Sequence, residues 1–288
     1  MLLVDASVYI FRAFHALPDS LVGADGRPVN AVHGYATFVQ QLLARATDDQ
    51  VAVAFDESLT TSFRNELYPD YKRNRETPPP ELIDQIAACR QITEALGVRT
   101  LASPTYEADD LIGTLARSAR EPVTIVTSDK DLAQLLGADD TLWDYARDVR
   151  YDAAAIEARF GVPPIRIPDY LALVGDAVDN IPGVPGVGAK TAAALLARFD
   201  DLGSILSDPG AVAGSGIRSA ARIADKLAAH ADQARLSRRL ATIVTDIDSV
   251  ECPRDIDRLL PDTDALGAVC ARLGLGAGIR TRLLGMAA

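Results

Sequence analysis

Short apolar runs recur in the first half of the chain, and an aspartate follows each of them. The runs with their aspartates are Leu2-Leu3-Val4 before Asp5, residues 51–55 before Asp56, and residues 123–127 before Asp129. Segments with helical spacing of apolar residues separate them, such as residues 35–44 and 82–96. Continuous apolar strands that alternate with helices are typical of a parallel sheet covered on both faces. The pattern predicts an α/β fold.

The carboxyl ends of parallel strands meet at one edge of the sheet, which is where ligands bind in such folds. A single aspartate after a strand is often a turn or a helix cap. Three repetitions favour a shared acidic site over three unrelated caps.

A further acidic group, Glu107, Asp109 and Asp110, begins an amphipathic helix after the strand-like residues 98–101. Helical geometry places Glu107 and Asp110 on one face. Acidic residues in a first helical turn are commonly solvated caps. Together with the aspartates after the strands, however, they predict a pocket of oxygen ligands suited to Mg²⁺ or Mn²⁺.

Residues 63–75 combine four basic and three aromatic side chains and are followed by Pro78-Pro79-Pro80. This could be a solvated helix and a linker, with a helix starting near Glu81 after the prolines. Cations for phosphates and rings for base stacking are also what a channel for single-stranded nucleic acid requires. The second interpretation is favoured, because the segment lies near the acidic edge in an acidic protein.

The second half of the chain is rich in helices, and its marked feature is a glycine hairpin at residues 183–188. Glycines allow close approach to a phosphate, and the free amides of a helix that opens near Lys190 can bind it. A structural turn is the alternative. The segment Gly188-Ala189-Lys190-Thr191 lacks the adjacent Gly-Lys pair of a P-loop. Asp176 and Asp179, three positions apart before the hairpin, could face one side of a helix.

The remainder of the second half predicts a flexible loop at residues 207–219 and a helix pair at residues 221–240. Basic side chains on the pair either extend a duplex-binding face or form a solvated surface. These are Arg222, Lys226, Arg235, Arg238 and Arg239.

Composition bears on the number of domains, the partners, the disulfides and the location of the protein. The 288 residues suffice for one large or two ordinary domains. A net charge of −11 argues against a nucleic-acid partner on average, although a binding site is local. Three scattered cysteines predict no disulfide, and the chain shows no signal peptide or membrane span, which predicts a cytoplasmic protein.

Six motifs together resemble the bacterial 5′→3′ exonuclease and flap endonuclease family, which includes the nuclease domain of type I DNA polymerases and free-standing homologues. The motifs are Leu3-Val4-Asp5 with Phe11-Arg12-Ala13-Phe14, Ala54-Phe55-Asp56, Phe63-Arg64 to Tyr71-Lys72, Glu107-Ala108-Asp109-Asp110, Asp129-Lys130-Asp131-Leu132, and Gly175-Asp176 to Gly188. Two departures are Ala6 and Ser128, where the family usually has glycine. Both replacements are small and leave the ligand set complete.

The resemblance implies a PIN-like domain over residues 1–150, with a central mostly parallel sheet, helices on both faces and a helical arch at about residues 62–95. It implies a helical domain over residues 151–288, with a helix-three-turn-helix motif of the helix-hairpin-helix type at about residues 171–200.

The resemblance also implies roles for individual residues. Those that resemble ligands of a first metal are Asp5, Asp56, Glu107, Asp109 and Asp110. Those that resemble ligands of a second metal are Asp129, Asp131, Asp176 and Asp179. Catalytic arch positions are Arg64, Tyr71 and Lys72. Further DNA-binding positions are Arg73, Arg75, Gly183, Val184, Gly186, Val187, Gly188, Lys190 and Thr191.

The implied activity is hydrolysis of phosphodiesters with two or more Mg²⁺ or Mn²⁺ ions, and in this family the hairpin can hold K⁺. Expected substrates are DNA 5′ flaps, nicked or overhanging duplexes and RNA–DNA hybrids, acted on by a nucleoid-associated monomer in replication and repair. Two other classes are a non-catalytic DNA-structure-binding protein, which predicts lost ligands, and a PIN-type ribonuclease, which would lack the hairpin module.

Overall fold

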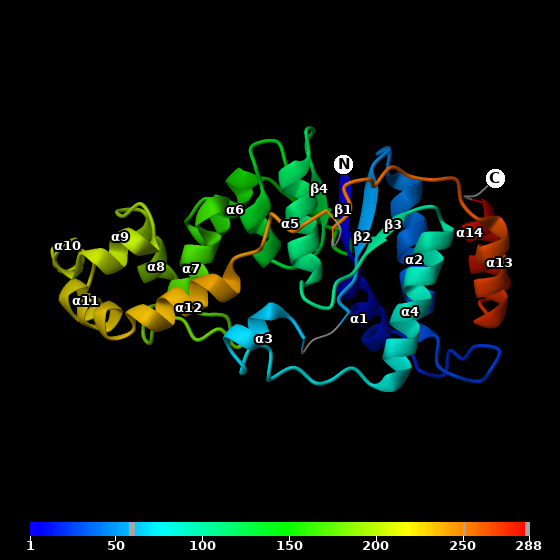
Figure 1. Cartoon of the computed structure of the whole chain (residues 1–288), viewed down its shortest axis with the longest axis horizontal. Helices are drawn as coiled ribbons and strands as arrows, with labels where there is room; N and C mark the ends of the chain where they lie inside the picture. Colours follow the sequence, from blue (N-terminus) through cyan, green and yellow to red (C-terminus); the bar gives the residue numbers. More distant parts are fainter. Residues whose placement is uncertain (58–60, 250–251, 286–288) are drawn as a thin grey trace. The chain divides into compact units, whose positions relative to one another are not determined.

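The computed structural model describes residues 1–57, 61–249 and 252–285. The chain forms two compact units. The first contains Met1–Glu57, Thr77–Ser128 and Thr245–Ala288, and the second contains Ser58–Glu76 and Asp129–Val244 (Figure 1).

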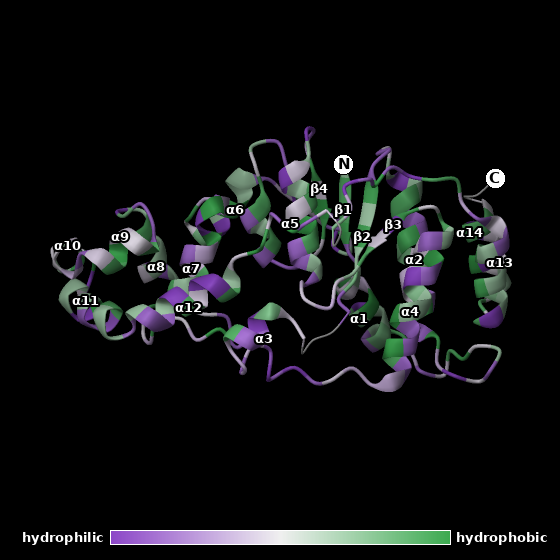
Figure 2. Ribbon diagram, viewed as in Figure 1, coloured by the Kyte–Doolittle hydropathy of each residue, from purple (hydrophilic) through white to green (hydrophobic). Residues whose placement is uncertain are grey.

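The first unit is built on four parallel strands in the order β3-β2-β1-β4. Their bounds are β1 Leu2–Asp5, β2 Val51–Ala54, β3 Arg99–Leu101 and β4 Thr124–Val126. Every residue of β1 and β2 is buried, as the continuous apolar runs predict, and the apolar residues of both strands are green in Figure 2. The chain adds β2 and β3 on one side of β1 and then β4 on the other. The strand order therefore reverses beside β1, where ligands bind in such sheets.

Helices cover both faces of this sheet (Figure 1). One face carries α1 Ala6–Ala16, α2 Asn30–Arg45 and α4 Pro80–Ala95, and the other carries α5 Ala108–Ser118. The last part of the chain returns to this unit as α13 Thr263–Arg272 and α14 Ala277–Gly285, which pack against α4 and α2.

The second unit is mostly helical. Its elements are α3 Phe63–Leu67, η1 Asp131–Leu135, β5 Thr141–Asp144, β6 Val149–Tyr151, α6 Ala153–Phe160, η2 Pro164–Arg166, α7 Ile167–Val174, α8 Ala189–Leu196, α9 Leu202–Ser207, α10 Pro209–Ala213, α11 Ala220–Ala229 and α12 Ala231–Ala241. The strands β5 and β6 form an antiparallel hairpin. The helix α12 packs along α7, and its outer side is strongly polar (Figure 2).

The helix-hairpin-helix prediction is confirmed by α7 and α8 with the glycine-rich turn between them. The expected helix over Asp176 and Asp179 is wrong. The helix α7 stops at Val174 because Gly175 takes φ +80°, and Asp176 then pairs with Ile181 through two backbone hydrogen bonds of 2.9 and 2.7 Å. A Cβ on Gly175 would lie 2.6 Å from the Ile181 carbonyl oxygen, so the turn requires glycine.

A second correction concerns residues 207–219, which the small residues predict as loop. Residues 209–213 form α10 instead, because Asp208 caps it by accepting a hydrogen bond from the Ala211 amide at 2.8 Å and proline starts its first turn. The helix pair predicted at residues 221–240 is confirmed as α11 and α12.

Candidate metal centre

In the first unit, Asp5 ends β1 and Asp56 follows the neighbouring strand β2, and both carboxylates accept hydrogen bonds from Ser7. The Asp5 carboxylate accepts hydrogen bonds from the Ser7 amide at 3.1 Å and from the Thr127 hydroxyl at 2.9 Å. The Ser7 hydroxyl donates to Asp56 at 2.7 Å. Since β1 and β2 are paired in register up to Asp5 and Ala54, both carboxylates emerge at the same edge of the sheet.

The acidic start of α5 joins this edge. The other oxygen of Asp56 accepts a hydrogen bond from the Ala108 amide at 2.9 Å. Glu107 is the N-cap of α5 and forms a capping box with Asp110, whose carboxylate accepts from the Glu107 amide at 3.1 Å. Both side chains are buried. Glu107 and Asp110 therefore do cap the helix, but they are buried and not solvated, and the cap fixes two carboxylates beside Asp56.

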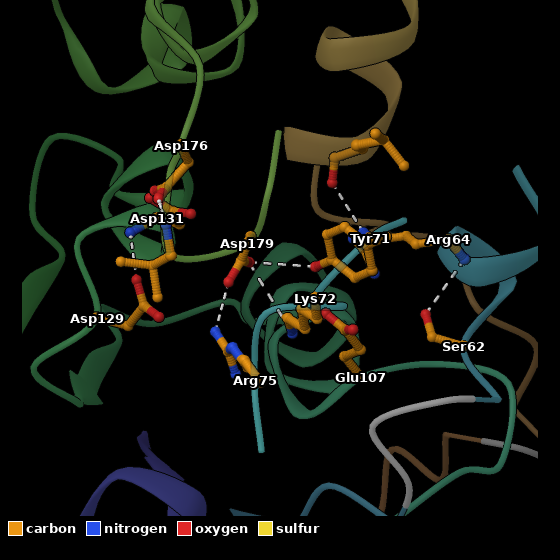
Figure 3. Close-up of polar contacts among 12 residues, drawn as sticks. Ser62, Arg64, Tyr71, Lys72, Arg75, Glu107, Asp129, Asp131, Asp176 and Asp179 are labelled. Carbon is orange, nitrogen blue, oxygen red and sulfur yellow. Dashed lines mark hydrogen bonds and ion pairs between the residues drawn. The ribbon is translucent and has the colours of Figure 1, made fainter. Parts of the chain in front are cut away.

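In the second unit, Asp129, Asp131 and Asp176 lie close to one another (Figure 3). Asp129 accepts a hydrogen bond from the Asp131 amide at 2.9 Å. Lys130 pairs with Asp176 and lies 3.6 Å from Asp131. The Oδ1 atom of Asp131 is buried and accepts no hydrogen bond. A buried carboxylate oxygen without a hydrogen-bond donor attracts a cation, and here the Lys130 ammonium lies 3.6 Å from this same atom.

Asp179 lies apart from these three and binds the basic aromatic segment (Figure 3). It accepts a hydrogen bond from the Tyr71 hydroxyl at 3.2 Å, pairs with Arg75, and lies 4.0 Å from the Lys72 ammonium. The Lys72 amide donates to the Asp179 carbonyl at 3.0 Å, with Lys72 held at φ +54°. Strained backbone of this kind persists where neighbouring contacts fix it. Tyr71, Lys72 and Arg75, which are predicted functional residues, thus attach this segment to Asp179, just before the glycine hairpin.

Arg64 has a different environment from Lys72. Only 2% of it is exposed, and its guanidinium donates to the carbonyls of Leu240 at 2.8 Å and Thr242 at 3.0 Å. These contacts join α3 to the end of α12. They favour a positioning role for Arg64 over direct contact with a phosphate.

The other predicted DNA-binding residues lie in the second unit, where some are exposed and others are buried. Arg73 is exposed and pairs with Asp70 at 2.7 Å. Gly186, Gly188, Lys190 and Thr191 lie at the turn before α8 and in its first residues, and no side chain caps this helix. Its first amides are therefore available to an anion. By contrast, Gly183, Val184 and Val187 are buried and support the turn.

Three residues with a direct effect on the carboxylates are not among the predicted site residues: Ser7, Thr127 and Lys130. Lys130 lies between two aspartates in the motif Asp129-Lys130-Asp131. A positive charge in that position could have identified it as a site residue from the sequence. Ser7 and Thr127 carry no comparable signal, because a hydroxyl after a strand is common.

The donor set suits a hard divalent cation, since all nine predicted ligands are carboxylates. Within residues 1–57, 61–249 and 252–285, no group of three or more His, Cys, Asp or Glu side chains has the arrangement of a metal site as it stands. Cations and amides hold the carboxylates instead. Lys130 and Arg75 therefore have to release Asp176 and Asp179 before these can bind a metal ion.

Burial, and next the charge of Asp129, raise the pKa of Asp131 to about 7. In the unfolded chain this carboxyl ionises near its ordinary value of 3.8. The folded metal-free protein thus holds a proton here that the unfolded chain lacks, so its stability falls as pH rises through this window.

If Asp131 is a metal ligand, it binds the ion as a carboxylate, and the apparent affinity for a divalent ion such as Mg²⁺ or Mn²⁺ is then expected to rise with pH until about pH 7. Binding at about pH 6, where this group is almost fully protonated, should release close to one proton per protein from it. Calorimetry in two buffers of different ionisation enthalpy measures that number, with Asp131→Asn as the variant that loses the release. Equal proton release by the variant would contradict the assignment.

A parallel sheet edged with carboxylates, in one chain with a glycine hairpin between two helices, is the combination expected of a 5′ nuclease. Comparison with known proteins agrees. The family models described as "5'-3' exonuclease, N-terminal resolvase-like domain" and "5'-3' exonuclease, C-terminal SAM fold" match residues 1–161 and 162–264. The chain belongs to the 5′-3′ exonuclease family, whose members are nucleases.

Two curated relatives show the extent of the similarity. The 5'-3' exonuclease of Buchnera aphidicola is 36% identical over 91% of this chain and 87% of its own length. The DNA polymerase I of Pseudomonas aeruginosa is 44% identical over 91% of this chain but only 28% of its own length. The chain thus spans about a quarter of the DNA polymerase I relatives that it matches.

Solved structures share the fold. A T5 5'-exonuclease with bound zinc superposes with a TM-score of 0.69 at 18% identity, over 100% of this chain and 99% of the other. The catalytic core of Rad2 in complex with DNA substrate gives 0.65 at 18% identity, over 99% and 91%. The mostly parallel sheet with helices on both faces and the helical C-terminal module are those of this nuclease fold, as predicted. None of the described helices is long and apolar enough to cross a membrane.

Proposed function

We propose that the chain is a structure-specific 5′ nuclease that hydrolyses phosphodiesters of 5′ flaps, nicked or overhanging duplexes and RNA–DNA hybrids. The observation that carries this is the complete set of nine carboxylates at the positions that resemble the family's metal ligands. We further propose Mg²⁺ or Mn²⁺ as the ions, K⁺ at the hairpin, action as a monomer, and a location at the bacterial nucleoid. The domain boundary near residue 150 is part of the same proposal.

Asp5, Asp56, Glu107, Asp109 and Asp110 would hold one ion, and Asp129, Asp131, Asp176 and Asp179 another. Bound divalent ions supply Lewis-acid stabilisation of the phosphate and lower the pKa of a coordinated water. The chain's own residues perform the remaining tasks. The Lys72 ammonium would offset charge on the phosphate once Asp179 engages metal, and Tyr71 beside it would orient the 5′ end.

The capping box and the Ser7 bridge would keep Glu107, Asp110, Asp5 and Asp56 in place without a metal ion. Such pre-organisation lowers the cost of binding, because the ligands need little reorganisation. The hairpin would hold the duplex by its backbone, which carries no base readout.

The test is a product-length assay on 5′-labelled flap and nicked duplexes, with Mg²⁺, Mn²⁺ or EDTA. Cleavage at the flap junction that requires the metal supports the proposal. Binding of the flap without cleavage under any metal would instead support the non-catalytic class, and preferential cleavage of an unstructured RNA would support the ribonuclease class.

A further inference from the structure

The charge of Lys130 is directed at two carboxylates that are predicted to bind the second metal ion. Its ammonium pairs with Oδ2 of Asp176 and lies 3.6 Å from Oδ1 of Asp131. The two aspartates belong to different segments, since Asp131 begins η1 and Asp176 comes after α7 and the turn at Gly175. Lys130 thus joins two segments whose carboxylates repel each other when both are ionised.

The ammonium contacts oxygen atoms that a metal ion needs. Oδ1 of Asp176 accepts a hydrogen bond from the Val178 amide at 2.7 Å, so Oδ2, which Lys130 binds, is the oxygen without a backbone donor. Oδ1 of Asp131 is buried and accepts no hydrogen bond. In the part of the chain that the structure describes, no other cationic side chain forms an ion pair with either aspartate. Lys130 is therefore the counter-ion of both.

The cation and its partners differ in burial. The side chains of Asp176 and Asp131 are 5% and 14% exposed, whereas that of Lys130 is 36% exposed. A lysine carries a compact charge on a flexible stem. The ammonium can therefore turn toward solvent without a change in the backbone, while the two carboxylates stay in place.

A divalent ion and the ammonium compete for these oxygens. Carboxylate oxygens bind Mg²⁺ at about 2.0–2.1 Å, and an ion at that distance from the atoms that Lys130 contacts would repel the ammonium strongly. Departure of Lys130 as the ion arrives replaces one positive charge with two. The carboxylates are neutralised before and after the exchange, so the site does not pass through a state without a counter-ion.

We propose that Lys130 is the resident counter-ion of the second metal site, which holds Asp131 and Asp176 together before metal binds and which the incoming divalent ion displaces. Lys130 is then a positioning residue that keeps the site assembled and also lowers its affinity for the ion. The inference rests on the proposed function, because it requires that these aspartates bind metal. It adds that this site takes up its ion by exchange of cations.

Removal of the lysine charge tests the exchange. In Lys130→Met, the second ion should bind about tenfold more tightly than in the wild type, because it no longer has to break a partly exposed, charge-assisted hydrogen bond. Free Mn²⁺ is measured by electron paramagnetic resonance during a titration at about pH 8.5, where the carboxylates are ionised. The second ion is identified as the one whose binding is lost in Asp176→Asn.

Two further variants separate the exchange from the general loss of a charge. Arg147→Met is the matched control, because Arg147 lies in the same unit and pairs at 3.0 Å with Asp144, which is not a predicted ligand. Its affinity for the second ion should be close to that of the wild type. Lys130→Arg keeps a counter-ion that can bind carboxylates, so it should restore an affinity close to that of the wild type.

The displaced side chain can be observed directly by NMR. The lysines of the chain are Lys72, Lys130, Lys190 and Lys226, so lysine labelled with ¹³C at Cε gives a spectrum simple enough to assign. The Lys130 signal, identified by its loss in Lys130→Arg, should move during a Mg²⁺ titration over the range in which the second ion binds. The Lys190 signal should stay, because Lys190 lies in the first turn of α8, away from these aspartates in sequence and contacts.

The sign of the change in affinity distinguishes exchange from a structural role. If Lys130 only supported the fold, the carboxylates of Lys130→Met would separate and bind the second ion more weakly. Weaker or unchanged binding, or a Lys130 signal that does not move while the ion binds, overturns the inference alone. If the wild type binds no ion that Asp176→Asn loses, with or without a nicked duplex, the second metal site is wrong and the proposed function fails with it.

Thermal melts show whether the substituted proteins are folded. In EDTA, Lys130→Met should unfold at a lower temperature than the wild type, because its aspartates lack their counter-ion. Addition of Mn²⁺ should then raise its melting temperature by more than that of the wild type, since tighter binding to the folded state stabilises it more. An equal or smaller rise contradicts the exchange.

Discussion

Replacing Asp129 with asparagine is expected to reduce metal-dependent cleavage of a 5′-flap DNA by about 10²- to 10³-fold. The substitution keeps the size of the side chain and the acceptor for the Asp131 amide, but it removes a charge from the ligand set. Several kcal/mol of transition-state stabilisation depend on a correctly held ion, and each 1.36 kcal/mol is tenfold in rate. The measurement is single-turnover cleavage with saturating enzyme and Mg²⁺.

Asp139→Asn is the matched control, because Asp139 is exposed in the same unit and loses the same charge. It should cleave at the wild-type rate. If Asp129→Asn also cleaves at that rate, the metal assignment of this aspartate is wrong. Recovery of the variant at high Mn²⁺ would show weakened metal binding, since excess ion compensates for lost affinity.

The strands and their aspartates were predictable because burial on both faces demands a continuous apolar run. The end of such a run leaves Asp5 or Asp56 at a known edge of the sheet. The hairpin was also predictable, because three closely spaced glycines at 183, 186 and 188 favour a tight turn of the backbone. These features are local, and local sequence specifies them.

The remaining parts of the site depend on contacts between distant residues. Asp176 and Asp179 have helical spacing, but Gly175 ends the helix because its positive φ lets the backbone pair with Ile181. The Asp179 contacts to Tyr71 and Arg75 span more than 100 residues and have no local signature. Asp110, in contrast, has a role that the local sequence does indicate. Its place in the first turn of a helix predicts capping, and capping is compatible with metal binding.

The burial of Arg64 also could not be predicted from the sequence. Its acceptors are 176 and 178 residues away in the chain, at the end of α12. An arginine between aromatic residues in a basic segment resembles a phosphate contact until these partners are known. The structure and the resemblance thus predict different effects for the same substitution.

Arg64→Gln is expected to destabilise the protein by about 1–3 kcal/mol. It would leave the carbonyl of the buried Leu240 without its donor, and an unsatisfied buried group costs about 1–3 kcal/mol, whereas the carbonyl of the exposed Thr242 can turn to water. Arg64→Lys should be nearly as destabilising, because one ammonium cannot reproduce the two directed N–H groups. Urea unfolding followed by circular dichroism measures the effect, and Arg73→Gln, at an exposed ion pair, should cost less than about 1 kcal/mol.

Activity separates the two roles of Arg64. If it positions α3 against α12, the folded variant at low temperature should cleave flaps within about tenfold of the wild-type kcat, since Lys72 and Tyr71 keep their own contacts with Asp179. A direct phosphate contact would instead lower kcat by about 10²-fold or more with little change in the urea midpoint. That second pattern would refute the positioning role, because an arginine that is 2% exposed and binds two backbone carbonyls is not accessible to a phosphate in this position.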